Sequence, residues 1–184
     1  MPDNLNQQFI GLSGFHDINS FSYGLSGKYY IHSPYEITNN QGFSDGQFTP
    51  SEFSVDVAFS YRIIKGLSAG VSLRYVNSVL SDKYKARAYS TDISVSYRTK
   101  SLRIAIAATN IGSKVDYGTT PYNMPMMAKV GIGYILGINE KNSIGIHAEG
   151  DFLVYKKNIM ASLGAEYSYN DMVFIRAGYH YGNI

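Results

Sequence analysis

The sequence predicts an all-β protein: an antiparallel β-barrel of the bacterial outer membrane, with about 9–10 strands present. Apolar and polar residues alternate along most of the chain. Many alternating segments reach the about 9–11 residues of a tilted membrane-spanning strand, against about 5–6 in globular proteins. Only 16% of the residues are charged, compared with about 25% in soluble domains. We expect residues 1–184 to form a single, partial barrel domain.

Each predicted strand depends on alternation, because successive residues of a strand point to opposite faces. In residues 53–63 the odd-numbered positions are apolar, and the even-numbered ones are small, polar or charged. A partial strand is expected at residues 9–15, followed by a turn at 16–20. The same alternation predicts the remaining strands at residues 21–31, 67–79, 89–97, 102–110, 128–136, 144–152, 159–169 and 173–181.

The connections between these strands alternate in length along most of the chain. Long links are expected at 33–51, 80–88 and 113–125, and short ones at 64–66, 99–101, 138–142 and 170–171. Outer-membrane barrels have long loops on one side and tight turns on the other. The link near residues 155–158 should be long by this rule and is short. A soluble β-sandwich would bury the same apolar rows, and is the rival interpretation.

Tyrosines lie near many of the predicted strand ends, as in the aromatic girdles of membrane barrels. The alternative is that tyrosine simply favours strands. The tyrosines concerned are Tyr29, Tyr61, Tyr75, Tyr97, Tyr167, Tyr169, Tyr179 and Tyr181.

Composition excludes several classes of protein. The chain has no cysteine, which excludes disulfide scaffolds, zinc–cysteine sites and thiol nucleophiles. Its net charge of +2 is too small to indicate nucleic-acid binding. No apolar run is long enough for a transmembrane helix. Residues 1–8 lack the charged and apolar regions of a secretory signal, and we expect the chain to be a fragment of a larger barrel.

Five short segments, in this order and spacing, resemble one known family. They are GQFTPSEF at 46–53, SLRYVNS at 72–78, TNIGSKVDY at 109–117, GAEY at 164–167 and RAGY at 176–179. Together they resemble the PorV/PorQ family of type IX secretion in Bacteroidetes, a branch of the FadL-like outer-membrane barrels. PorV is the better match. Family members are longer and have more strands than this chain.

The resemblance implies a non-enzymatic protein of the bacterial outer membrane. It would bind the C-terminal signal domains of secreted cargo and partner the translocon barrel, within outer-membrane lipid and without a cofactor or nucleic acid. One alternative is a FadL-like transporter of hydrophobic small molecules. The other alternative is a barrel enzyme that uses His147 and Glu149.

The long link at 113–125 is the best candidate for a partner-binding element. Exposed methionine and tyrosine beside proline make an adaptable contact surface. A loop folded into the barrel mouth is the alternative. The candidate residues in and next to this link are Tyr117, Pro121, Tyr122, Met124 and Met126.

A second set of candidates is a lumenal charge network. It comprises Arg74, Asp92, His147, Glu149, Glu166 and Arg176. His147, Glu149 and Asp151 alternate, so they share one face and suit either a metal site or acid–base chemistry. Paired charges in a polar barrel interior are the simpler interpretation, and we expect no bound metal.

Glycines close or interrupt two of the predicted strands. Gly112 is expected to adopt a turn conformation after Asn110. Gly131, Gly133 and Gly137 mark either a bend of the strand or the close approach of a neighbouring group.

Overall fold

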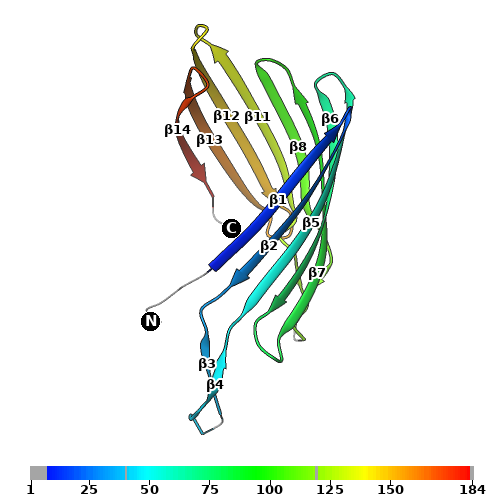
Figure 1. Ribbon diagram of the computed structural model, residues 1–184, viewed down its shortest axis with the longest axis vertical. Coiled ribbons are helices and arrows are strands. Elements are labelled where there is room, and N and C mark those ends of the chain that lie inside the picture. The colour runs from blue at the N-terminus through cyan, green and yellow to red at the C-terminus, as the bar shows by residue number, and fades with distance from the viewer. Residues whose placement is uncertain (1–7, 40, 119, 183–184) are drawn as a thin grey trace.

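Ten strands form one antiparallel sheet in which each strand pairs with the next main strand of the chain (Figure 1). The computed structural model describes residues 8–39, 41–118 and 120–182. This part of the chain contains no helix long and apolar enough to cross a membrane. The ten strands are β1 (Gln8–Ile18), β2 (Phe21–Ile31), β5 (Ser51–Ile64), β6 (Leu67–Val79), β7 (Lys85–Arg98), β8 (Leu102–Gly112), β11 (Met127–Gly137), β12 (Asn142–Leu153), β13 (Asn158–Tyr169) and β14 (Val173–Tyr181).

These strands coincide with the segments predicted from alternation, but several boundaries differ. The turn predicted at residues 16–20 is wrong in its first half. There β1 continues to Ile18, and Asn19 makes the turn with a left-handed φ of 55°. Two predicted long loops contain short hairpins, and β7 begins at Lys85 inside a third. The hairpins are β3 (Tyr35–Thr38) with β4 (Ser44–Phe48), and β9 (Lys114–Val115) with β10 (Tyr122–Asn123).

Register assigns every residue of the sheet to one of two faces, because residues directly opposite each other point the same way. Leu25 lies opposite Val57, and Val57 lies opposite Leu73. The face they share, here called the apolar face, carries the apolar row of each strand and all eight girdle tyrosines. Its side chains remain exposed: Leu163 by 62% and Ile106 by 61%.

The opposite face of the sheet, here called the polar face, holds the charges. Within the ten main strands, every described Asp, Glu, Lys and Arg lies on it except Lys85 and Arg87 at the start of β7. A cavity opens on this face, lined by residues of β7, β8, β11, β12 and β13, which indicates that the polar face is the concave one. The few buried apolar side chains also lie here, near the end with the long connections: Ala86, Ala88, Leu153 and Met160.

The sheet curls but does not close. Among the described residues, β1 pairs only with β2 and β14 only with β13, so both outer edges are free (Figure 1). The prediction of an all-β antiparallel fold is confirmed, and a closed barrel is not formed by this part of the chain.

A β-bulge interrupts the pairing of β7 with β8, where the register shifts between Thr91 and Ile93. Asn110 takes the left-handed conformation there, with a φ of 56°. The turn conformation predicted for Gly112 is therefore wrong, since the special backbone angle belongs to Asn110. Gly112 serves a different purpose: a Cβ atom at this position would lie 2.0 Å from the carbonyl oxygen of Tyr89.

Candidate functional site

The best-connected group of charges on the polar face is centred on Arg74 of β6. Its Nε atom donates to Asp56 of β5, and its Nη2 atom lies 3.7 Å from Oδ2 of Asp92 on β7. Ser26 donates to Asp56 at 3.2 Å, and Ser72 donates to Asp92 at 3.3 Å. One cation therefore contacts two carboxylates on the strands either side of it, and the hydroxyl groups of Ser26 and Ser72 donate to the same carboxylates. Four adjacent strands are joined by this group.

The β-bulge extends this group towards the loop that follows β8. The backbone N–H of Asn110 donates to Oδ1 of Asp92 at 2.7 Å, and Arg74 donates to the Asn110 side chain at 3.2 Å. The Asn110 amide in turn donates to the carbonyl oxygen of Pro125 at 3.1 Å. The left-handed backbone of Asn110 thus ties the end of the long loop to the charge network.

Three of the four remaining predicted residues, Glu149, Glu166 and Arg176, belong to two other clusters. Lys129 of β11 lies 2.9 Å from Glu149 and 3.3 Å from Asp151 on β12. Arg176 of β14 donates to Glu166 of β13. The prediction of one lumenal network is therefore wrong in its connectivity, because the described ion pairs form three separate clusters. Sequence reasoning missed Asp56 and Lys129, although both occupy polar-row positions of predicted strands.

His147 shares the polar face with Glu149 and Asp151, as predicted, but joins none of the described ion pairs. Its imidazole lies against two glycines: a Cβ atom at Gly133 would be 2.5 Å from Nδ1, and one at Gly145 would be 2.9 Å from Nε2. Gly133 therefore marks the close approach of a neighbouring group. The described residues contain no group of three His, Cys, Asp or Glu side chains that could hold a metal ion.

The loop after β8 folds inward over the polar face. Tyr117 donates a hydrogen bond of 2.8 Å to the Ser78 hydroxyl, and its ring stacks on that of Tyr122 with centroids 6.2 Å apart. Partial desolvation, followed by the neighbouring Tyr117 hydroxyl, raises the pKa of Tyr122 to about 12. Ala86 and Ala88 of the sheet, near this loop, are only 4% and 2% exposed. This arrangement corresponds to the alternative considered for this link, a loop folded into the mouth of the sheet.

The candidate partner-binding residues are thereby divided. Pro121 and Tyr122 are exposed, whereas Tyr117, Met124 and Met126 are half-buried. Only the first two are fully presented to a partner. Thr119, between them and Tyr117, lies outside the described residues.

The same end of the sheet carries further exposed aromatic side chains, and each of its four connections contributes at least one. Phe43 is 69% exposed between β3 and β4, and Tyr84 is 47% exposed between β6 and β7. Tyr122 is 52% exposed after β8, and Tyr155 is 56% exposed between β12 and β13. We call these four residues the aromatic rim. Sequence reasoning missed three of them, although the available signal was an aromatic residue within a largely polar connection.

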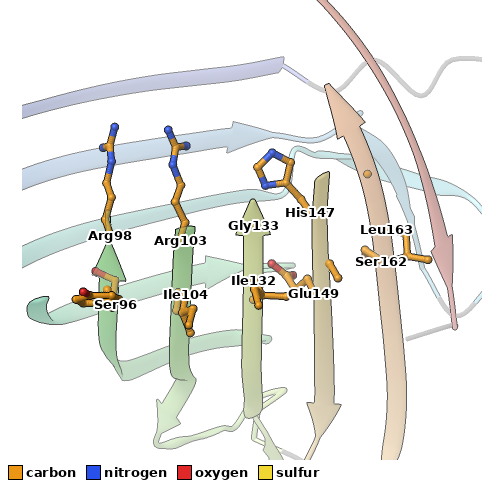
Figure 2. A pocket seen from close by; sticks show the side chains of 15 residues that line it. Ser96, Arg98, Arg103, Ile104, Ile132, Gly133, His147, Glu149, Ser162 and Leu163 are labelled. Atoms are coloured by element: carbon orange, nitrogen blue, oxygen red, sulfur yellow. The ribbon is translucent and has the colours of Figure 1, made fainter. Parts of the chain in front are cut away.

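A cavity of about 510 Å³ lies towards the other end of the polar face. Figure 2 shows Arg98, Arg103 and His147, which extend from β7, β8 and β12 in the same direction. Small residues line the sheet around these three side chains: Ala105, Gly131 and Gly133 on β8 and β11, and Ser162 and Gly164 on β13 beyond His147. Neither arginine was a candidate from the sequence, because both lie next to a short turn: Arg98 is the last residue of β7, and Arg103 is the second residue of β8.

The chain matches no protein-family model and no curated protein.

Proposed function

We propose that this chain is part of a β-barrel in the bacterial outer membrane, with its apolar face in lipid. The observation that carries this proposal is the segregation of charge. The apolar face exposes aliphatic and aromatic side chains on every main strand, while the charges gather on the concave face. In water, an apolar face of this kind would be buried against other protein. In a membrane, lipid hydrocarbon solvates it directly.

The spacing of the aromatic residues supports the same placement. Tyr89 and Tyr97 lie on the apolar face of β7, with Ile93 midway between them. Eight residues of strand extend about 27 Å, or about 20 Å along the membrane normal at a tilt of about 40°. That height is close to the apolar band of about 25 Å in outer-membrane barrels.

The role proposed for this barrel is in type IX secretion: binding the C-terminal signal domains of cargo and partnering the translocon. Two observations support it. The five sequence segments resemble the PorV/PorQ family, and the aromatic rim offers four exposed rings at the end with the long connections. Aromatic side chains are enriched where proteins bind one another.

The test is a tagged pull-down from native membranes in mild detergent, read by mass spectrometry. We expect recovery of a very large translocon barrel, and of secreted proteins that share a C-terminal domain. A rim variant with serine at Phe43, Tyr84, Tyr122 and Tyr155 should lose both. The matched control carries serine at Ile138 and Met172, which are 58% and 77% exposed in connections at the opposite end. The control should retain both partners.

A FadL-like transporter of hydrophobic small molecules is the second candidate, and the cavity of about 510 Å³ on the concave face favours it. The two arginines in its lining, Arg98 and Arg103, count against an apolar ligand. Recovery of the barrel alone with a bound apolar molecule would contradict the secretion role and support the transporter.

A further inference from the structure

The cavity on the polar face is crossed by one row of residues in direct register. Arg98 of β7 lies opposite Arg103 of β8, and Arg103 lies opposite Gly133 of β11. Gly133 lies opposite His147 of β12, and His147 lies opposite Gly164 of β13. The row therefore places two guanidinium groups side by side, with an imidazole beyond one glycine (Figure 2).

Two like charges directly opposite each other on a sheet destabilise it. Elsewhere on the polar face, Arg74, Lys129 and Arg176 each meet a carboxylate within ion-pair distance. Arg98 and Arg103 take part in none of the ion pairs found among the described residues, and neither do Lys28 and Arg62 of the same face. Unlike Lys28 and Arg62, Arg98 and Arg103 lie directly opposite each other, and no carboxylate of the described residues relieves their repulsion.

The cavity lining contains one acidic residue, Glu149. Its carboxylate lies 2.9 Å from Nζ of Lys129, which also lies 3.3 Å from Asp151, so this cluster keeps one net negative charge. Arg98 and Arg103 together carry two positive charges. The balance of the cavity and this cluster is therefore one positive charge, which favours an anion.

We propose that this cavity is a binding site for a small oxyanion ligand, one that carries a phosphate or a carboxylate group. A guanidinium group binds either a phosphate or a carboxylate through paired, charge-assisted hydrogen bonds. An anion between Arg98 and Arg103 relieves their repulsion, and His147 offers a third polar contact. The volume of about 510 Å³ falls in the range of small-molecule sites, about 300–1,000 Å³. The site lies away from the aromatic rim and does not depend on the secretion role.

Isothermal titration calorimetry of the whole chain in detergent tests this proposal. Inorganic phosphate is titrated in one experiment and succinate in another, which separates the two ligand chemistries. We expect at least one of them to bind, and the Arg98→Gln/Arg103→Gln variant to bind it about tenfold more weakly or worse, a loss of about 1.4 kcal/mol or more.

The matched control is Lys28→Gln/Arg62→Gln, which removes two positive charges from the same face outside the cavity lining. Binding to this control should be unchanged. A second variant, Gly131→Val, places a branched apolar side chain in the cavity without changing its charge. A Cβ atom there meets nothing closer than 3.9 Å, so the strand accommodates it. Gly131→Val should weaken binding as well.

Three results would overturn the site: no binding of either anion, equal binding by the double-arginine and parent chains, or an equal loss in the Lys28/Arg62 control.

Discussion

Arg74 stands between carboxylates of two neighbouring strands and satisfies both. Asp56 is only 8% exposed, so its charge depends on the groups beside it. Arg176 makes a single pair with Glu166, and its own side chain is 68% exposed to solvent. Similar sequence patterns thus produce two ion pairs that contribute very differently to stability. Water screens the exposed Arg176–Glu166 pair, and it screens the Arg74–Asp56 pair much less.

Arg74→Ala should therefore destabilise the sheet by about 1–3 kcal/mol, since it leaves a buried carboxylate without its partner. Arg176→Ala, the matched control, should cost about 0–1 kcal/mol. The measurement is the free energy of unfolding in urea, followed by circular dichroism of the protein in detergent. Equal losses for the two variants would show that Arg74 does not hold a buried network.

At the scale of elements, the positions of the main strands could be predicted from the sequence. The residues that face each other on neighbouring strands could not. Alternation located all ten main strands, because each has nine or more residues over which the pattern repeats. The hairpins in the long links were not predicted because their strands are short: β9 and β10 have two residues each, and β3 and β4 have four and five. The pairing of Asp56 with Arg74 escaped for a different reason: it depends on register between strands, which a single-strand pattern does not contain.

The inward fold of the loop after β8 is a property of the β9–β10 hairpin as a unit. Tyr117 anchors it to Ser78 and leaves Ala88 of the sheet buried. The chain has no cysteine, so a single introduced cysteine reports on one position.

Tyr117→Ala should therefore speed maleimide labelling of Ala88→Cys, because the hairpin loses its hydrogen bond and one of its stacked rings. The control is Ser94→Cys, on the polar face of the same strand, where the rate should stay constant. Rapid labelling of Ala88→Cys before Tyr117 is changed would contradict the inward fold.

At the scale of the whole molecule, the apolar face and the two free edges of the sheet need contacts that the described residues do not supply. The apolar face needs a nonpolar solvent, and the edges of β1 and β14 need hydrogen-bond partners, because lipid supplies none. A membrane barrel provides both. The covered faces of a β-sandwich would instead require a second large sheet, and the only other sheets formed by the residues that the structure describes are two hairpins of two strands each.

Placement in lipid predicts that the same substitution changes stability very differently at two neighbouring positions. Ile93→Arg puts a charge on the apolar face midway between Tyr89 and Tyr97, and should cost about 2–4 kcal/mol in lipid. Ser94→Arg puts it on the polar face, near Asp92, and should be tolerated. Folding yield into vesicles, titrated with urea, measures both. A larger loss for Ser94→Arg would reverse the assignment of the faces.

The most direct test of the account is the local environment of consecutive residues along β7 in lipid vesicles. Spin labels on single cysteines at positions 93, 94, 95 and 96 would be probed by collision with oxygen, which concentrates in lipid, and with a water-soluble nickel complex. We predict that positions 93 and 95 respond to oxygen and positions 94 and 96 to nickel. Equal protection of positions 93 and 95 from both reagents would mean that protein covers the apolar face, and would contradict the membrane placement.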